Sequence, residues 1–289
     1  MTALDDMPGR PSIAAKLRSW PMLGAILKSP AALIGLAILV VWGLVALLAP
    51  WIAPYDPNAI DFMAAAAPRP SAAHWLGTDA TGRDLLSRVM WGARTTYSVV
   101  PLAIGSAFTV GILLGVPAGY FGGWYDDVVS RLSDVILAFP ALILYIILIT
   151  AFGPSLLNIV IAVTLAYAPG VSRIARGITL SLRERDYVAA AQARGESSVA
   201  IMAVEILPNA RGPLVVDLCL RAGYTVILTG TLGFLGLGLP PPTADWGGMV
   251  VESAHLLPLH PHMAIVPCIA ISSVVIACNL LADSLRGAR

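Results

Sequence analysis

The chain has 289 residues, of which 57% are hydrophobic and only 12% are charged, and its net charge is +1. Soluble domains carry about 25% charged residues, so water cannot be the solvent for most of this surface and lipid must cover much of it. The small net charge also excludes the broad positive surface that nucleic-acid binding requires. The composition therefore predicts an integral membrane protein.

The first 29 residues precede a long uncharged run and carry four basic residues, Arg10, Lys16, Arg18 and Lys28. A cleaved signal peptide would have a shorter apolar core followed by a small-residue cleavage site. The run over 31–53 is long enough to stay as an anchor, because a helix needs about 20 apolar residues to cross the hydrocarbon core. We therefore expect a cytoplasmic segment over 1–29 and a transmembrane domain over 30–289.

Uncharged runs predict about six transmembrane helices, because the backbone must satisfy its own hydrogen bonds inside lipid. The third and fourth helices share one uncharged stretch over 135–172, which is too long for one crossing, and Gly153-Pro154-Ser155 in its middle supplies a turn. The expected fold is therefore all-α. The predicted spans are about 31–53, 95–118, 130–152, 156–175, 212–237 and 263–282.

Basic residues predict the orientation, because cytoplasmic segments carry an excess of Lys and Arg. The loop over 54–94 has four Arg offset by four Asp, and the segment over 239–262 has no Lys or Arg. We therefore expect both termini inside, the loop 54–94 outside and the loop 176–211 inside. With that topology 12 of the 18 basic residues lie inside: Arg10, Lys16, Arg18, Lys28, Arg173, Arg176, Arg183, Arg185, Arg194, Arg211, Arg286 and Arg289.

The cytoplasmic loop over 176–211 has an unusual pattern. The stretch 186–194 is rich in alanine and begins with Asp186, which suits the positive end of a helix. Gly195 then breaks the helix, and Ser197 can cap a second short helix that ends at Leu207-Pro208. We expect two short helices with a bend. The alanines of the first helix leave room for the surface of a partner protein to approach closely. A plain hairpin lying on lipid would have the same spacing.

This loop resembles the EAA loop of ABC-importer permeases, in which Glu-Ala-Ala is followed by a glycine and then by Leu-Pro. The matching residues here are Ala189, Ala190, Ala191, Gly195, Leu207 and Pro208. Ala189 stands where the family often has Glu, so a charge contact from that position is not expected. The resemblance implies that the loop docks on an ATPase, with Tyr187 and Arg194 as further candidate contacts.

Further segments resemble permeases of the dipeptide/oligopeptide/nickel family, and together the matches run from about residue 30 to the end. The segment 74–79 and the long loop before it resemble the C-type member of a two-permease pair. The matching segments are 74–88, 119–124, 137–140, 232–238, 241–243, 246–247 and 279–286.

The resemblance implies a transmembrane subunit of an ATP-binding-cassette importer in a prokaryotic plasma (inner) membrane. Such a subunit forms half of an alternating-access path for peptides or related small solutes, nickel chelates included. Its implied partners are a homologous second permease, two ATP-binding subunits, an extracytoplasmic substrate-binding protein and membrane lipid. It would be no enzyme and would bind no cofactor, since ATP and Mg are used by the ATPase subunits. The sequence agrees, because Lys16 and Lys28 are its only lysines and neither follows a glycine as a P-loop requires.

Polar residues in the predicted spans are candidates for the translocation path or a gate, because intramembrane charges are costly and often functional. Asp217 and Arg221 are four residues apart and share a helix face, and Arg131 and Asp134 are three apart. Neutralisation within each pair, or hydrogen bonding between helices, would explain the same pattern. The candidates are Asp134, Tyr145, Asn158, Tyr167, Asp217, Arg221 and Asn279.

His255, His260 and His262 cluster before the last span, but no acid or cysteine completes a metal-ligand spacing. We interpret them as loop histidines and expect neither a metal site nor catalytic residues. The alternative function is an ion-coupled secondary transporter, which would need no docking loop and usually shows internal repeats. Isolation together with two ATPases would separate the two hypotheses.

Overall fold

The computed structural model describes residues 24, 26–27 and 29–286, so the predicted segment 1–29 lies almost wholly outside the described residues. The described part is helical and contains no strand, with only two isolated bridges, Ile60 with Arg83 and Thr78 with Asp84. Five of its helices are long and apolar enough to cross a membrane, and a bent helix pair makes a sixth candidate crossing. The all-α membrane fold is thus confirmed.

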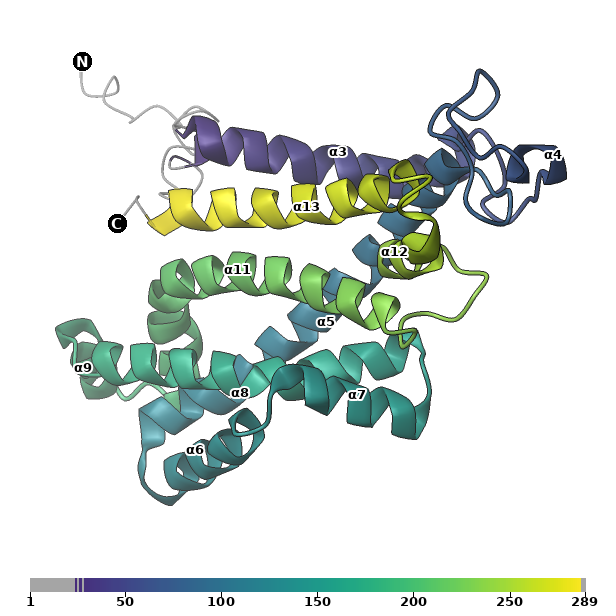
Figure 1. The fold of residues 1–289 in the computed structure, drawn as a ribbon. Helices are drawn as coiled ribbons and strands as arrows, with labels where there is room; N and C mark the ends of the chain where they lie inside the picture. Colours follow the sequence, from purple (N-terminus) through teal and green to yellow (C-terminus); the bar gives the residue numbers. More distant parts are fainter. Residues whose placement is uncertain (1–23, 25, 28, 287–289) are drawn as a thin grey trace, which may run out of the picture.

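The first long helix, α3, spans Pro30–Ile52. Its start is capped by the Ser29 hydroxyl, which accepts a hydrogen bond from the backbone N–H of Ala32, and Pro30 suits the first turn because it has no N–H to satisfy. The same hydroxyl lies 2.9 Å from that of Ser284 on α13, His262–Arg286. These contacts hold α3 beside α13 (Figure 1).

Helix α5 spans Leu85–Phe121 and therefore begins ten residues before the predicted start at 95. Asp84 caps it by accepting a hydrogen bond from the Ser87 N–H. The prediction was wrong here because Arg88 and Arg94 were assigned to the loop, whereas Arg88 is buried among acidic partners inside the helix. The connection between α3 and α5 shortens accordingly and contains the short helix α4, Phe62–Ala65.

The predicted span over 130–152 is not one helix. It consists of α6, Gly123–Leu137, and α7, Ala141–Phe152, which meet at an angle of 84°. Pro140 explains the break, because it has no N–H to donate and it disfavours helical geometry in the residue before it. The next helix, α8, spans Leu156–Leu182 from a Ser155 cap and continues past the predicted end at 175.

Helices α5 and α8 make the most extensive contact between described helices of the bundle. Gly111, Gly115 and Gly119 recur every four residues along α5 and face the α8 backbone around Val171, Ser172 and Arg176. A side chain at these positions would collide with α8, so the glycines let the two backbones approach.

The loop after α8 forms helix α9, Asp186–Ala193, followed by α10, Ser198–Ala200, and a π-helical turn, η1, Ile201–Ile206. The turn continues without a gap into α11, Leu207–Phe234, so Leu207-Pro208 does not end a helix as the sequence predicted. Pro208 lies directly after the π-helical turn η1, so its missing N–H falls where the regular hydrogen-bond pattern of the helix is already interrupted. The segment after α8 is therefore one short helix, a bend and a continuous helix.

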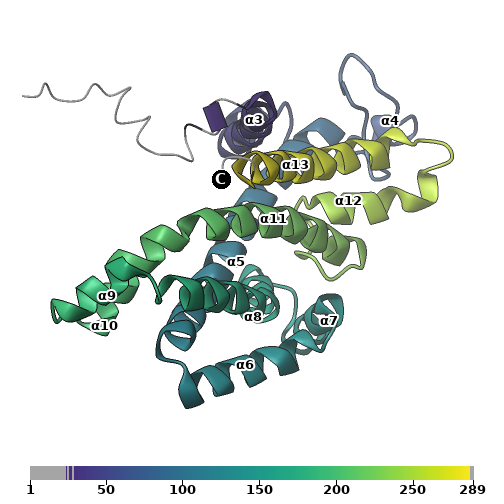
Figure 2. The ribbon, with the colours of Figure 1, turned by 90° about the vertical axis from the view of Figure 1, so that its left-hand side faces the viewer.

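The bundle has two sides. Helices α3 and α13 lie on one side of α11, and α6, α7 and α8 lie on the other, while α5 crosses between them at a steep angle (Figure 2). The start of α3, the end of α13 and α9 share one end of the molecule (Figure 1). The opposite end has α4 and α12, Trp246–Ser253, which continues as a 3-10 turn, η2, Ala254–Leu256.

Candidate functional site

An ion pair lies within the membrane part of α11. The Nε of Arg221 donates to Oδ2 of Asp217 at 2.7 Å, one helical turn away, and the two side chains are only 18% and 15% exposed. Across from them, Gly170 on α8 admits the guanidinium, since a Cβ there would lie 2.8 Å from its Nη2. The guanidinium carbon also lies 5.6 Å from the centre of the Tyr167 ring. Arg221 is thus held from two helices.

Three tyrosines lie on or beside the helices that hold this pair. Tyr145 on α7 is fully buried, and its hydroxyl has no hydrogen-bond partner among the described residues. Tyr145 belongs to the hydrophobic core against which Tyr167 packs, and the Tyr167 ring lies against Arg221. Tyr224 lies three residues after Arg221 on α11. An unpaired buried hydroxyl costs about 1–3 kcal/mol, so packing does not account for Tyr145. We call the five residues Tyr145, Tyr167, Asp217, Arg221 and Tyr224 the intramembrane cluster.

The other predicted path residues lie elsewhere. The side-chain amide of Asn158 donates to the carbonyl oxygens of Phe152 and Gly153 at 2.9 and 2.8 Å and so closes the end of α7. Asn279 is exposed on α13. Asp134 is exposed on α6 and pairs with Arg173 on α8 rather than with the neighbouring Arg131. The structure therefore separates these three from the cluster.

Helix α9 splits its alanine triplet between two environments. Val188 and Ala191 are buried against the hydrophobic core that includes Ile201 and Ile206, whereas Ala189 and Ala190 are exposed. Tyr187 is half-buried in the same core, with its hydroxyl buried and without a partner among the described residues. Ala191 and Tyr187 therefore pack α9 against this core, and Ala189 and Ala190 lie on its exposed face.

Gly195 ends α9 in a left-handed conformation, with φ at 76°. Its N–H donates to the Gln192 carbonyl at 2.9 Å, and the N–H of Glu196 donates to the Ala191 carbonyl at 3.2 Å. This pair of bonds is the common glycine-dependent helix end. Arg194 pairs with Glu196 at 2.6 Å, so its charge is already balanced. Leu207 is half-buried and Pro208 exposed at the start of α11.

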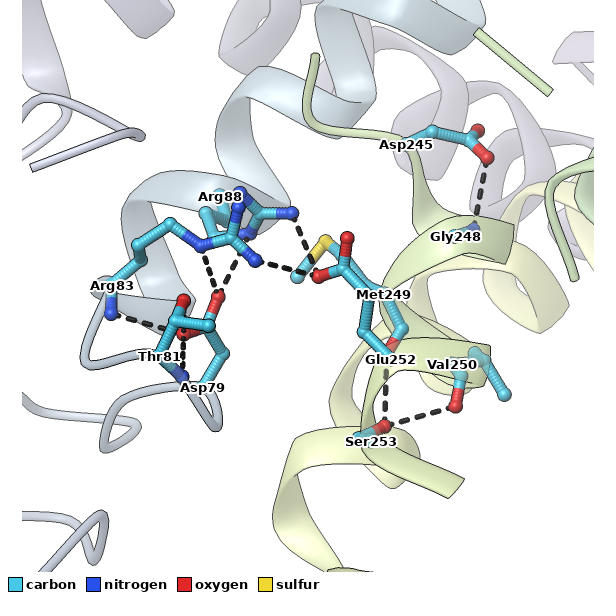
Figure 3. Close-up of polar contacts among 10 residues, drawn as sticks. All are labelled: Asp79, Thr81, Arg83, Arg88, Asp245, Gly248, Met249, Val250, Glu252 and Ser253. Carbon is cyan, nitrogen blue, oxygen red and sulfur yellow. Dashed lines mark hydrogen bonds and ion pairs between the residues drawn. The ribbon is translucent and has the colours of Figure 1, made fainter. Parts of the chain in front are cut away.

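At the opposite end, an ion-pair network joins the loop before α5 to α12 (Figure 3). Arg83 contacts Oδ2 of Asp79 at 2.6 Å and Oε2 of Glu252 at 2.7 Å. Arg88, only 1% exposed, lies 3.4 and 3.2 Å from the same two oxygens. Burial by itself would raise the pKa of Asp79, but hydrogen bonds from Thr81 and Arg83 outweigh it and hold the pKa below its usual value.

The start of α12 adds two contacts to this end. Asp245 caps α12 by accepting a hydrogen bond from the Gly248 N–H at 2.9 Å, while its burial raises the pKa of the carboxyl (Figure 3). Trp246 is buried, and its indole N–H donates to the Val89 carbonyl on α5 at 2.9 Å. Sequence reasoning missed Glu252 and treated the other charges of the network as loop residues. The available signal was the dense run of charges over 79–88.

We expect Glu252→Gln to destabilise the protein by about 3 kcal/mol, because it leaves the buried Arg88 with one acid instead of two. The value is at the lower end for a broken buried pair, since the Glu252 side chain is 35% exposed and water can partly replace it. The thermal unfolding midpoint in detergent should fall. Glu184→Gln changes an exposed carboxylate elsewhere and serves as the control. Equal midpoints for the two variants would contradict the role of the network.

The histidines do not meet as a metal site. No group of three or more His, Cys, Asp or Glu side chains able to hold a metal forms among the described residues. The His260 and His262 rings lie 5.9 Å apart, and Nε2 of His262 lies 2.8 Å from the Pro68 carbonyl oxygen. The fourth histidine, His74, is buried and contacts Asp84 at 2.9 Å. His74 and His262 therefore tie loop segments together.

Two family models match the sequence. Residues 111–288 match the binding-protein-dependent transport system inner membrane component, and residues 23–69 match the N-terminal TM domain of oligopeptide transport permease C. The first match covers more than half of the chain and contains both α9 and the intramembrane cluster.

Individual relatives align over most of the chain. The glutathione transport system permease protein GsiD of Pectobacterium atrosepticum is 36% identical over 84% of this chain and 81% of its own length. The dipeptide transport system permease protein DppC of Alkalihalophilus pseudofirmus is 36% identical, over 90% and 86%. The probable D,D-dipeptide transport system permease protein DdpC of Escherichia coli is 36% identical, over 96% and 93%.

Proposed function

The chain belongs to the family of binding-protein-dependent transport system inner membrane components, and we propose that it forms half of the translocation path for peptides or peptide-like solutes. It is a permease subunit of an ATP-binding-cassette importer. The observation that carries the proposal is the alignment with glutathione and dipeptide permeases over most of both chains. Glutathione, dipeptides and related small solutes, including nickel chelates, are the proposed cargo.

The proposed complex has four kinds of subunit. A homologous second permease completes the path, two ATP-binding subunits dock on the cytoplasmic face, and an extracytoplasmic binding protein delivers the cargo. ATP and Mg are used by the ATP-binding subunits, and this chain itself neither hydrolyses ATP nor binds a cofactor. The excess of basic residues over 1–29 and 173–211 supports a prokaryotic inner-membrane orientation with both termini inside.

Helix α9 is the proposed site of coupling to the ATP-binding subunits. Its exposed Ala189 and Ala190 offer a flat surface for close approach, at the end of the molecule where α3 begins and α13 ends (Figure 1). Its buried Val188 and Ala191 contact the core shared with η1, α8 and α11. Closure of the ATP-binding subunits would therefore shift α8 and α11 together, as alternating access requires.

Co-purification and reconstitution test the proposal. We expect the chain to be isolated with two ATP-binding subunits and a second permease, and to take up a dipeptide or glutathione in proteoliposomes with ATP and the binding protein. Vanadate should stop this uptake. Proton-driven uptake by the isolated chain, without ATP-binding subunits, would instead support the ion-coupled secondary transporter, which the family membership does not favour.

A further inference from the structure

The intramembrane cluster is hard to explain as packing. A buried ion pair adds little stability, because the cost of removing both charges from water offsets their attraction. The pair nevertheless lies within a candidate membrane span, and the Tyr167 ring of α8 lies against the guanidinium. Charged residues inside a membrane protein usually mark a substrate or ion path.

Arg221 has a guanidinium edge that the protein does not use. Its Nε is bonded to Asp217, and one face lies toward the Tyr167 ring. Its two terminal nitrogens make no hydrogen bond within the described part of the chain. Paired N–H groups on a planar guanidinium match the two oxygens of a carboxylate and bind it in a bidentate manner. The buried hydroxyl of Tyr145, in the core against which Tyr167 packs, is also unpaired there and is a further hydrogen-bond donor.

We infer that the intramembrane cluster is a transient binding site for a carboxylate group of the cargo. Arg221 is the binding residue, Asp217 and Tyr167 position its guanidinium, and the Tyr145 hydroxyl donates to the cargo. The inference rests on the proposed function, since dipeptides and glutathione have in common a carboxylate that must cross the membrane.

The ion pair with Asp217 explains why such a site would not trap its ligand. An unpaired Arg in a low-dielectric environment would bind an anion tightly, whereas a neutralised Arg binds it weakly. A transport path needs sites that attract the solute but also release it. Asp217 therefore moderates the site, and its position four residues before Arg221 is what keeps the charge balanced.

The test uses the complete importer in proteoliposomes and two probes, alanyl-alanine and its C-terminal amide. The double variant Asp217→Asn/Arg221→Gln removes both charges together and keeps a polar side chain at each position, so a purely neutralising role predicts no change. We expect alanyl-alanine uptake to fall at least about tenfold, because both guanidinium hydrogen bonds to the carboxylate are lost and a single bond to a charged group already accounts for about that factor. Uptake of the amide should change little, and ATPase stimulation by the binding protein should persist, because α9 is untouched.

Two single variants make the test independent of how the double variant folds. Tyr145→Phe removes only the unpaired hydroxyl and should lower the acid-to-amide uptake ratio about threefold, as expected for one neutral hydrogen bond. Tyr97→Phe is the matched control, because the Tyr97 hydroxyl donates to the Leu39 carbonyl at 2.8 Å, outside the cluster. It should keep the wild-type ratio.

The outcomes separate the inference from the proposed function. Wild-type ratios in both Tyr145→Phe and the double variant would overturn the carboxylate site while leaving the importer function intact. A lowered ratio in Tyr145→Phe supports the site even if the double variant assembles poorly. Failure of the wild-type importer to take up either probe would count against the proposed substrate class and the inference with it.

Discussion

Gly115→Leu prevents the permease from folding into its native bundle. A Cβ at this position would overlap the carbonyl oxygen of Ser172 on α8 and lie 2.8 Å from its Cα. Both obstacles are backbone atoms, which cannot rotate away as a side-chain end could. Overpacking costs about 1–3 kcal/mol where side chains can adjust, so the effect here should exceed about 3 kcal/mol.

Gly111 and Gly119 make this substitution severe, because they lie one turn before and after Gly115 in the same close contact with α8. A Cβ at Gly111 would lie 2.6 Å from that of Val171, and a Cβ at Gly119 2.6 Å from the Arg176 carbonyl oxygen. Separating the helices at Gly115 would therefore lose the neighbouring contacts too. The yield of monodisperse protein in detergent and its unfolding midpoint measure the effect. Gly105→Leu is the control, because Gly105 lies on the same helix and a Cβ there would meet nothing within 4 Å. Equal yields and unfolding midpoints for the two variants would contradict the close packing of these glycines against α8.

Gly195→Val should uncouple ATP hydrolysis from transport. Valine at a φ of 76° is strained, by roughly 1–2 kcal/mol for the left-handed conformation, and β-branching adds to this. No atom outside the neighbouring residues would lie within 4 Å of the new Cβ, so the strain acts on the backbone bend between α9 and α10 rather than through a collision. We expect α9 to shift relative to the core residues of η1, α8 and α11 against which it packs. Uptake should then fall at least about tenfold while the assembled importer still hydrolyses ATP, since about 1.4 kcal/mol corresponds to a factor of ten.

Two controls isolate backbone conformation from bulk. Gly195→Asn should retain transport, because asparagine tolerates the left-handed region at helix ends. Gly177→Val adds the same bulk to a helical glycine of α8 that has open surroundings, and should also retain transport. The measurement is uptake per ATP hydrolysed in proteoliposomes. Retained substrate-stimulated uptake by Gly195→Val would contradict a coupling role for the bend.

Local signals in the sequence were sufficient for the helical membrane fold and for several helix ends. The length of an uncharged run identifies a membrane crossing because lipid excludes charged side chains. The Ser155 cap begins a helix and the left-handed Gly195 ends one, each through hydrogen bonds or backbone angles of residues next to it in the chain. The same locality explains why Asp217 and Arg221 could be paired from their spacing of one helical turn. Each of these features depends on residues within about one turn of each other, as helix end and face rules do.

Contacts between distant segments were decided only by the tertiary structure. Arg88 could enter α5 only because Glu252, on a helix far along the chain, helps to balance its charge. Asp134 pairs with Arg173 on α8 and not with the nearer Arg131. Tyr145 lies in the core against which Tyr167 packs, whereas Asn158 donates to the carbonyl groups at the end of α7. By itself the sequence determined the class of fold, the approximate crossings and the bend at Gly195. Which charges and phenols meet inside the bundle depends on how α5 crosses α8 and on the break at Pro140, and no spacing along the chain encodes that geometry.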